Sequence, residues 1–187
     1  MLSKHRNEFT EGSWTLRVVD DFDKLKAFDC GKDDLNEFFH EDCYIQQQEL
    51  LHKTYSLIEA TVEDFFPVAL ISLCNDSIRK DKILNRLGFR GTKKDYPSYP
   101  AVKIARFGVR KELKRQNIGT HTMNMIKKMF ITNNRTGCRF LTVDAYNEDD
   151  VLPFYQHNDF QFFSDKDKNK KLRAMFFDLK RLNIHNP

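Results

Sequence analysis

The feature that most constrains the fold is the stretch from Val102 to Lys127, where an apolar strand pattern runs into a basic turn and then a helical pattern. A strand that feeds a short loop into a helix leaves backbone N–H groups of the first helical turn unpaired. Those donors and the positive end of the helix dipole suit a phosphate or pyrophosphate. Because Lys111, Lys114 and Arg115 surround the turn, the sequence predicts an anion-binding loop, suited to a nucleotide-containing cofactor.

The motif around this loop is unspecific when it is taken alone. The dinucleotide signature GxGxxG and the Walker signature GxxxxGK[ST] are both absent from the sequence. Within KRQNIGT (114–120), Asn117 and Gly119 are the residues that adopt unusual backbone angles at low cost. A solvated turn that caps an amphipathic helix explains the same residues equally well.

The rest of the chain alternates strand and helix patterns. Strands are expected at 14–19, 55–62, 68–74, 140–145, 160–163 and 174–179, and helices at 33–51, 77–87, 118–133 and 149–158. This alternation predicts one layered domain of the mixed α/β (α+β) class. The expected domain covers residues 14–182, with a flexible N-terminus at 1–13 and a loop at 89–100 that could border a substrate groove.

Composition sets broad limits on function. The 187 residues fit one domain, and 17 Phe against one Trp must supply much of the buried surface. A net charge of +4 neither requires nor excludes a nucleic-acid partner. No apolar run reaches membrane-spanning length and the N-terminus lacks a signal-peptide centre, so a cytoplasmic protein is expected. The four cysteines form no CxxC pair, so no metal site is expected.

A second group of residues lies in DAYNEDDVLPFYQHNDF (144–160). Here Asn147 follows a strand and Tyr155 lies in the next helix. A phenol at such a junction can protonate a departing thiolate, because the pKa values of phenols and thiols are not far apart. A tyrosine that only packs against its neighbours explains the pattern as well.

Taken together, the two groups resemble the GNAT acetyltransferases, which use acetyl-CoA. The resemblance covers roughly residues 14–182 and rests on ARFGV (105–109), KRQNIGT (114–120), FLTVDA (140–145) and the spacing of Asn147, Phe154, Tyr155, Asp159 and Phe160. It implies a single domain with a central mixed, mostly antiparallel sheet flanked by helices. The implied activity is acetyl transfer to a primary amine by direct attack.

The resemblance also implies roles for individual residues. Tyr155 corresponds to the general acid for the coenzyme A thiolate, and Asn147 to the loop residue near the pantetheine arm. The other implied cofactor-binding residues are Phe107, Gly108 and Val109 on the strand that pairs with pantetheine, and Lys114, Arg115, Gln116, Asn117, Ile118, Gly119 and Thr120 in the pyrophosphate loop. Two positions depart from the family: Asn117 replaces a glycine of that loop, and Asp159 stands where glycine is preferred.

A closer resemblance is to the branch that includes toxins acetylating aminoacyl-tRNA. It rests on AFDCGKDDLNEFFHEDCYIQQQ (27–48) together with ARFGVRKELKRQNIGTHTM (105–123). The branch implies tRNA and an antitoxin as partners. A basic rim for tRNA could come from Lys93, Lys94, Lys111, Lys114, Arg115 and the tail KDKNKK (166–171), although a solvated surface explains these charges too.

The general base and the oligomeric state, a homodimer included, stay open. Candidate bases are Glu59, Glu63, Asp76 and Asp144, and an ordered water could serve instead. A non-catalytic member of the fold that binds a ligand or partner is the alternative from another class.

Overall fold

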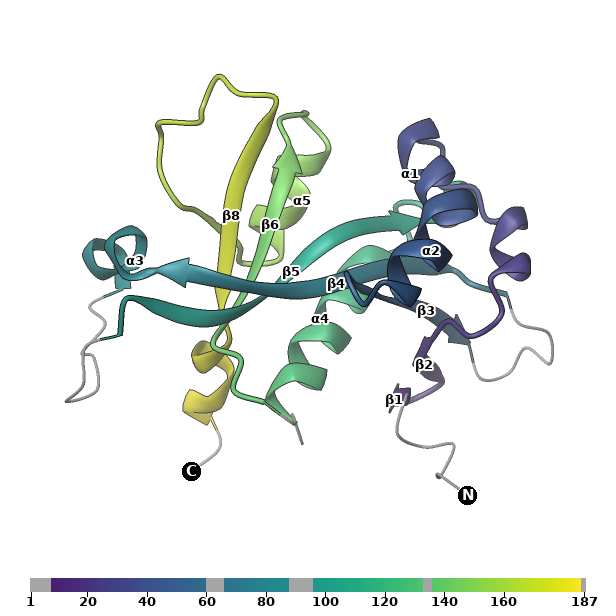
Figure 1. Cartoon of the computed structure of the whole chain (residues 1–187), viewed down its shortest axis with the longest axis horizontal. Helices are drawn as coiled ribbons and strands as arrows, with labels where there is room; N and C mark the ends of the chain where they lie inside the picture. The colour runs from purple at the N-terminus through teal and green to yellow at the C-terminus, as the bar shows by residue number, and fades with distance from the viewer. Residues whose placement is uncertain (1–7, 60–65, 88–95, 133–135, 186–187) are drawn as a thin grey trace. The chain divides into compact units, whose positions relative to one another are not determined.

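The structure is a computed structural model that describes residues 8–59, 66–87, 96–132 and 136–185. The chain divides into two compact units. The first unit comprises Met1–Cys74 with Ala105–Met129, and the second comprises Asn75–Ile104 with Phe130–Pro187. Two long strands labelled in Figure 1, β4 (Ala69–Arg79) and β5 (Ser98–Val109), contribute residues to both units.

The first unit contains an antiparallel run of strands and a long helical segment. Its elements are β1 (Glu8–Glu11), β2 (Trp14–Val18), a 3-10 turn (Asp23–Ala27), α1 (Asp33–Glu37), a π-helical turn (Phe38–Asp42), α2 (Cys43–Gln48), β3 (Lys53–Glu59) and most of α4 (Ile118–Ile131). β1, β2, β3 and β4 pair in sequence order, each antiparallel to the next. The hydrogen-bond register sets Leu16 opposite Leu57, and both side chains are fully buried.

The second unit contains the parallel pair of the sheet. Its elements are α3 (Lys80–Leu87), β6 (Phe140–Tyr146), α5 (Val151–His157), β7 (Gln161–Phe162), β8 (Leu172–Asp178) and a 3-10 segment (Leu179–His185). β5 pairs with β6 in parallel, whereas β6–β8 and β7–β8 are antiparallel.

Hydrogen bonds connect the strands in the order β1-β2-β3-β4-β5-β6-β8-β7. The pairs β1–β2, β2–β3, β3–β4, β6–β8 and β7–β8 are antiparallel, and the pair β5–β6 is parallel. The predicted fold class is therefore confirmed: a mixed, mostly antiparallel sheet combined with helices. None of the helices in the described ranges is long and apolar enough to cross a membrane.

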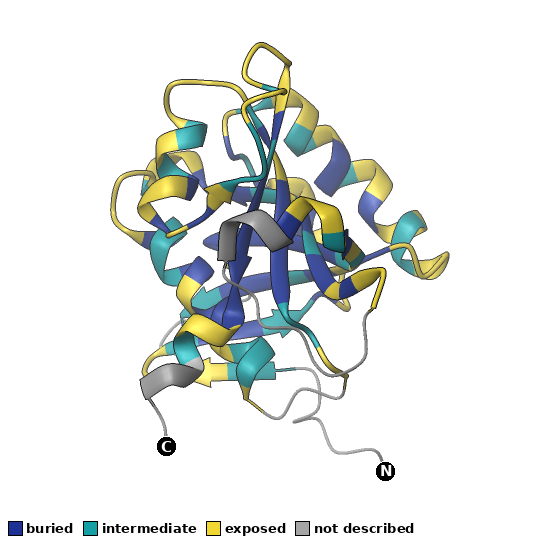
Figure 2. Ribbon diagram, turned by 90° about the vertical axis from the view of Figure 1, so that its left-hand side faces the viewer, coloured by how far each residue is buried: buried dark blue, intermediate teal, exposed yellow. Residues whose placement is uncertain are grey.

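Each unit has its own phenylalanine-rich core. In the first unit Phe28, Phe38 and Phe39 pack edge to face, with ring centroids 5.4–5.7 Å apart. In the second unit Phe140 and Phe176 pack at 6.2 Å beside Ile78 and Ile83. Figure 2 shows buried residues gathered on the strands and on one side of the longer helices. The expectation that phenylalanine supplies much of the core is confirmed, since four of the largest fully buried side chains are Phe.

Several predicted boundaries are wrong, and the reasons are local. β4 continues to Arg79, whereas a helix was expected from Ser77, because Ile78 is buried in a continued in–out alternation despite the turn-favouring Asn75 and Asp76. A short strand that the sequence did not indicate, β1, forms at Glu8–Glu11, because its backbone pairs with β2. The expected loop at 89–100 lies outside the described residues up to position 95, and β5 begins at Ser98.

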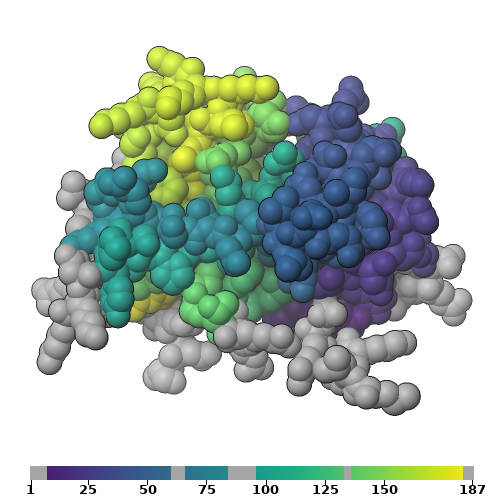
Figure 3. All heavy atoms as spheres, viewed as in Figure 1, coloured from purple at the N-terminus to yellow at the C-terminus, as the bar shows by residue number. Residues whose placement is uncertain are grey.

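The helix expected at 33–51 is instead two short α-helices, α1 and α2, joined without a break by a π-helical turn. A π-helical turn at Phe38–Asp42 separates α1 from α2. This run buries Phe38, Phe39 and Cys43. It lies on the face drawn in Figure 3, where it is blue. The residues at and just beyond its end carry exposed apolar side chains: Tyr44, Ile45, Leu50 and Leu51.

Candidate cofactor site

The loop after β5 is a series of tight turns in the first unit. Arg110 is followed by a 3-10 turn at Lys111–Leu113, in which the Leu113 N–H donates to the Arg110 carbonyl at 3.0 Å. Arg115 and Asn117 then take left-handed backbone angles, with φ of 63° and 62°. Asn117 was expected to tolerate such angles. Gly119 has no positive φ because it already lies in the first turn of α4, and Arg115 takes the second left-handed position instead.

The N-terminus of α4 presents backbone donors. Its first internal hydrogen bond runs from the His121 N–H to the Asn117 carbonyl at 2.9 Å. The N–H groups of Ile118, Gly119 and Thr120 precede that bond and have no backbone acceptor among the described residues. The side chain of Ile118 is buried, whereas residues 114–117 are exposed. The loop therefore combines a fixed backbone with donors that an anion can reach.

The positive charge around this loop is smaller than the sequence suggests. The Lys111 ammonium forms an ion pair with the Asp29 carboxylate at 2.6 Å, so its charge is compensated. Lys114 and Arg115 are exposed in the loop itself. Lys93 and Lys94 lie outside the described residues. The cationic side chains left for an anion in this loop are those of Lys114 and Arg115.

The end of β5 carries the three residues expected to pair with pantetheine, Phe107, Gly108 and Val109. The parallel ladder with β6 stops at the pair Ile104–Val143, and β5 runs on to Val109. Gly108 allows close packing here within the first unit. A Cβ at this position would lie 3.0 Å from Cys30 Cβ and 3.2 Å from Cys30 Sγ. A larger residue would require the Cys30 side chain to shift by a few tenths of an ångström.

Tyr155 lies in α5 of the second unit and is only 6% exposed. Its ring packs between Phe154, at a centroid distance of 5.1 Å, and Phe160, at 5.4 Å. This burial raises the pKa of the Tyr155 phenol above its ordinary value. The side chain is therefore a protonated, neutral donor at neutral pH.

The residues after α5 hold Tyr155 by a Schellman motif. The N–H of Phe160 donates to the Tyr155 carbonyl at 3.0 Å, and the N–H of Asp159 donates to the Gln156 carbonyl at 2.9 Å. Asp159 has a φ of 62°. The position where glycine is preferred is therefore a true left-handed cap, which an aspartate fills in this chain.

Asn147 follows β6 and has a structural role, holding the 168–171 segment, that the sequence did not indicate. Its side-chain amide donates to the carbonyls of Lys168 and Lys170, both at 2.9 Å. Its backbone N–H donates to the Lys171 carbonyl at 2.9 Å. Asn147 thus ties the lysine-rich tail to the end of β6.

Two of the candidate bases are engaged in the second unit. Asp76 accepts hydrogen bonds from the Thr142 hydroxyl at 2.5 Å and from the Ser77 N–H at 2.7 Å. Asp144 forms an ion pair with Lys103. Glu59 ends β3, and Glu63 lies outside the described residues. Within the described ranges, no group of three or more His, Cys, Asp or Glu residues could hold a metal ion.

Sequence inspection missed the residues that surround Lys111. Asp29 accepts hydrogen bonds from the Gly31 N–H and the Asn36 side chain, at 2.7 and 2.8 Å. The signal was present in the sequence, since Asp-x-Gly is typical of a side-chain-closed turn. Nothing in the sequence indicated that this turn meets Lys111.

Of three comparisons with known proteins, only the one with solved structures gives matches. No protein-family model and no curated protein matches the sequence significantly. Among solved structures, the toxin AtaT complexed with acetyl-methionyl-tRNAfMet matches with a TM-score of 0.70 and 23% identity, over 91% of this chain and 98% of that chain. A bacterial toxin matches with a TM-score of 0.72 and 14% identity, over 91% of this chain and 93% of that one.

Two further solved structures match over similar lengths. AtaTR bound with acetyl-CoA has a TM-score of 0.64 and 20% identity, over 92% of this chain and 97% of that chain. A Tyr-to-Phe mutant of the toxin KacT has a TM-score of 0.65 and 18% identity, over 92% and 99%. The predicted resemblance is confirmed at the level of structure: the chain has a GNAT-like fold, and its structural neighbours are the toxins AtaT and KacT.

Proposed function

We propose that this chain is an acetyl-CoA-dependent N-acetyltransferase whose acceptor is the amino group of an aminoacyl-tRNA. The observation that carries the proposal is the N-terminus of α4, where exposed turns deliver unpaired N–H groups beside Lys114 and Arg115. Such a terminus suits a pyrophosphate. Support for the cofactor comes from the neighbour bound with acetyl-CoA, and support for the acceptor from AtaT complexed with acetyl-methionyl-tRNAfMet.

Under this proposal each group of residues has a separate role in binding the cofactor. The N–H groups of Ile118–Thr120 and the side chains of Lys114 and Arg115 hold the pyrophosphate. The strand amides of Phe107–Val109 pair with the pantetheine arm, and Asn147 lies beside it. Acetyl-CoA supplies an acetyl group already activated as a thioester.

In the transfer step the acceptor nitrogen forms a bond to the carbonyl carbon, and the bond from that carbon to sulfur breaks. Tyr155 gives its phenolic proton to the leaving sulfur, and the new amide nitrogen loses a proton to water. The burial that raises the pKa of Tyr155 keeps this proton in place before the reaction. The same desolvation makes the phenol a weaker acid. Desolvation of the leaving thiolate offsets this effect, because it makes the thiolate a stronger base.

The acceptor itself reduces the need for a base. The α-amine of an aminoacyl ester is more acidic than an ordinary primary amine, so a larger share is unprotonated at neutral pH. This agrees with the ion pair of Asp144 and the two hydrogen bonds of Asp76, which leave both carboxylates engaged. A general amine acceptor, the broader expectation, would need a dedicated base.

Replacing Tyr155 by Phe tests the proposal. Transfer of radiolabelled acetyl from acetyl-CoA to aminoacyl-tRNA should fall about a hundredfold or more in Tyr155→Phe. The dissociation constant for coenzyme A should stay nearly unchanged. Tyr99→Phe, which changes another buried tyrosine of the second unit, is the matched control and should keep full activity.

Ligand-induced stabilisation tests the cofactor separately. Acetyl-CoA at 100-fold its dissociation constant should raise the free energy of unfolding by about 2.7 kcal/mol. NAD should give no shift in Tm. A shift without acetyl transfer to any amine would support the non-catalytic alternative, and no shift at millimolar acetyl-CoA would overturn the assignment of the loop.

A further inference from the structure

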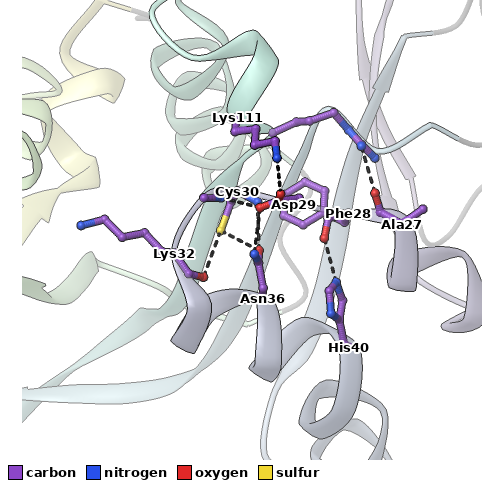
Figure 4. Close-up of polar contacts among 10 residues, drawn as sticks. Ala27, Phe28, Asp29, Cys30, Lys32, Asn36, His40 and Lys111 are labelled. Carbon is purple, nitrogen blue, oxygen red and sulfur yellow. Dashed lines mark hydrogen bonds and ion pairs between the residues drawn. The ribbon is translucent and has the colours of Figure 1, made fainter.

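A short segment of the first unit, residues 27–31, lies against the candidate pyrophosphate loop. We call it the support segment. It ends in a turn in which Gly31 has a φ of 70° and donates its N–H to the Asp29 carboxylate at 2.7 Å. Figure 4 shows this segment between the helical turn that carries Asn36 and the residue Lys111. It therefore has contacts on two sides.

On the loop side, the support segment holds the two residues where the loop begins. The backbone N–H of Lys111 donates to the Asp29 carbonyl at 2.9 Å, and its ammonium pairs with the Asp29 carboxylate at 2.6 Å. Arg110 donates from its guanidinium to the Ala27 carbonyl at 3.0 Å. The backbone and the side chain of Lys111 are thus both fixed by one residue, Asp29.

Arg110 also attaches the start of the loop to residues 66–68 of the first unit. It is only 8% exposed, and its guanidinium donates to the Pro67 carbonyl at 3.2 Å. The guanidinium also lies over the ring of Phe66 at 4.1 Å, and the Arg110 N–H donates to the Val68 carbonyl at 3.0 Å. The start of the loop is therefore a fixed point.

On the helix side, Asn36 of α1 holds the support segment. Its side-chain oxygen accepts from the Cys30 N–H at 2.9 Å, and its amide N–H donates to the Asp29 carboxylate at 2.8 Å (Figure 4). His40 adds a hydrogen bond of 2.7 Å from its ring nitrogen to the Phe28 carbonyl. The hydrogen bonds from Lys111, Gly31 and Asn36 lower the pKa of Asp29, so its carboxylate stays charged at neutral pH.

From Lys111 onward the loop has little freedom. The Leu113 N–H donates to the Arg110 carbonyl, and the side-chain amide of Gln116 donates to the Glu112 carbonyl at 3.3 Å. Arg115 and Asn117 are held at left-handed angles that non-glycine residues adopt at a cost. A displacement of Lys111 would therefore move the donors at the start of α4.

We propose that Asp29 and Asn36 are positioning residues for the pyrophosphate loop, acting through Lys111 on the N–H groups at the start of α4. This inference rests on the proposed function, because the ligand of the loop is taken to be coenzyme A. Neither residue is assigned contact with the cofactor. Their role is to set the geometry of the donors before the ligand arrives, which lowers the ordering cost of binding.

Asp29→Asn separates positioning from simple electrostatics. The amide oxygen can still accept from the Gly31 N–H, but the amide nitrogen cannot pair with the Lys111 ammonium. If Asp29 were only a negative charge near the site, its removal would tighten the binding of an anionic cofactor. Positioning predicts the opposite sign: a dissociation constant for coenzyme A, measured by calorimetry, that rises about fivefold.

Asn36→Asp breaks the same chain of contacts from the helix side. The new carboxylate can still accept from the Cys30 N–H, but it faces the Asp29 carboxylate where the wild type has a donor. Coenzyme A binding should weaken about five- to tenfold at pH 7.5. As the pH is lowered towards 5, two adjacent carboxyls share a proton and the hydrogen bond returns, so the ratio of mutant to wild-type affinity should recover.

Asn124→Asp is the matched control, because it makes the same charge change at an exposed position of α4 in the same unit. It should weaken binding by no more than about twofold, as expected for a screened surface charge. Neither recovery at low pH nor a fivefold loss is expected for this variant.

The outcomes are distinct. Weaker binding by Asp29→Asn and pH-dependent recovery by Asn36→Asp would support the positioning role. A lowered Tm with wild-type affinity for coenzyme A would show that the support segment only stabilises the fold and would overturn the inference, as would tighter binding by Asp29→Asn. If wild-type protein binds no coenzyme A, the proposed function fails instead. Should Asn36→Asp not fold, Asp29→Asn decides alone, since Asp29 lies at a partly exposed position.

Discussion

Four residues other than glycine take left-handed backbone angles within the described ranges: Leu50, Arg115, Asn117 and Asp159. Each side chain there has a Cβ that crowds the following carbonyl. Arg115 and Asn117 precede the donors of α4, and Asp159 closes the Schellman motif that holds Tyr155. Three of these four positions therefore lie next to the proposed chemistry, as is common at functional sites, whereas Leu50 follows α2.

Asp159 offers a direct measurement of that strain. Asp159→Gly should raise the free energy of unfolding by about 0.5–1 kcal/mol, because glycine takes a φ near 62° without a Cβ clash. Urea denaturation measures the change. Asp159→Ala is the control at the same position and should lower stability, since alanine keeps the clash. Equal stability of the two variants would contradict the cap assignment.

His52 is the residue whose burial should be visible in the pH dependence of stability. Both ring nitrogens are buried without a hydrogen-bond partner among the described residues, and the ring packs on Phe38 at 5.2 Å. Burial and the nearby Arg106 guanidinium lower the pKa of His52 below its ordinary value of 6.5. The unfolded chain therefore binds a proton near pH 6.5 that the folded chain takes up only at lower pH, so stability falls as the pH drops through this window.

Replacing His52 by Phe removes this proton uptake and keeps an aromatic ring against Phe38. The free energy of unfolding, measured by urea titration between pH 7.5 and 5, should decline less steeply in His52→Phe than in wild type. His157→Gln, at an exposed position, controls for the loss of a histidine. An unchanged slope in His52→Phe would mean that other groups cause the acid sensitivity.

At the scale of elements, the segment after β7 is held by two clamps in the second unit. Asn147 donates to the carbonyls of Lys168 and Lys170, as described above. Arg173, only 7% exposed, stacks on Phe162 at 3.7 Å and donates to the Ser164 carbonyl at 3.2 Å. The Asp167 carboxylate turns inward and accepts from the Ala174 N–H at 2.9 Å.

Removing one clamp should loosen the segment between β7 and β8. In Asn147→Ala, trypsin should cleave after Lys168, Lys170 or Lys171 several times faster than in wild type, because local opening precedes cleavage. Mass spectrometry of early fragments identifies the sites. Asn124→Ala, at an exposed position, should leave the cleavage rate unchanged. A wild-type rate in Asn147→Ala would show that Arg173 alone holds the segment.

The sequence predicts an element well when local signals determine it, and poorly when pairing with other strands determines it. The strand, basic turn and helix from Val102 to Lys127 were predictable because apolar periodicity and helix-terminus chemistry are local signals. The extension of β4 to Arg79 was not, because Asn75, Asp76 and Ser77 favour turns and only pairing with other strands overrides that preference.

The candidate site likewise contains residues that the sequence could indicate and residues that it could not. The residues of the loop, Asn147 and Tyr155 were marked by local pattern and by family resemblance, and their roles stay predictions. The ion pair between Asp29 and Lys111 joins residues 82 positions apart in the sequence, so no local pattern could indicate it. The π-helical turn at Phe38–Asp42 also has no sequence signature that separates it from an α-helix.

At the scale of the whole molecule, the net charge of +4 does not show how the cations are distributed over the surface. Lys111, Lys103 and Arg139 are each paired with an aspartate. The tail at 166–171 differs, since its four lysines are exposed while Asp167 is turned inward. This tail is therefore a stronger candidate for phosphate contacts than its mixed sequence suggests.

If an aminoacyl-tRNA is the acceptor, this tail should contribute to the salt dependence of its binding. Each lysine that neutralises a phosphate adds about 0.7–0.9 to the slope of log affinity against log salt concentration. The double variant Lys170→Gln with Lys171→Gln should therefore lower the slope by about one to two. Its affinity for coenzyme A should stay at the wild-type value. The double variant Lys24→Gln with Lys26→Gln removes the same charge from an exposed turn of the first unit and is the control. Identical slopes in both double variants would show that the tail is only a solvated surface and contributes nothing to tRNA binding.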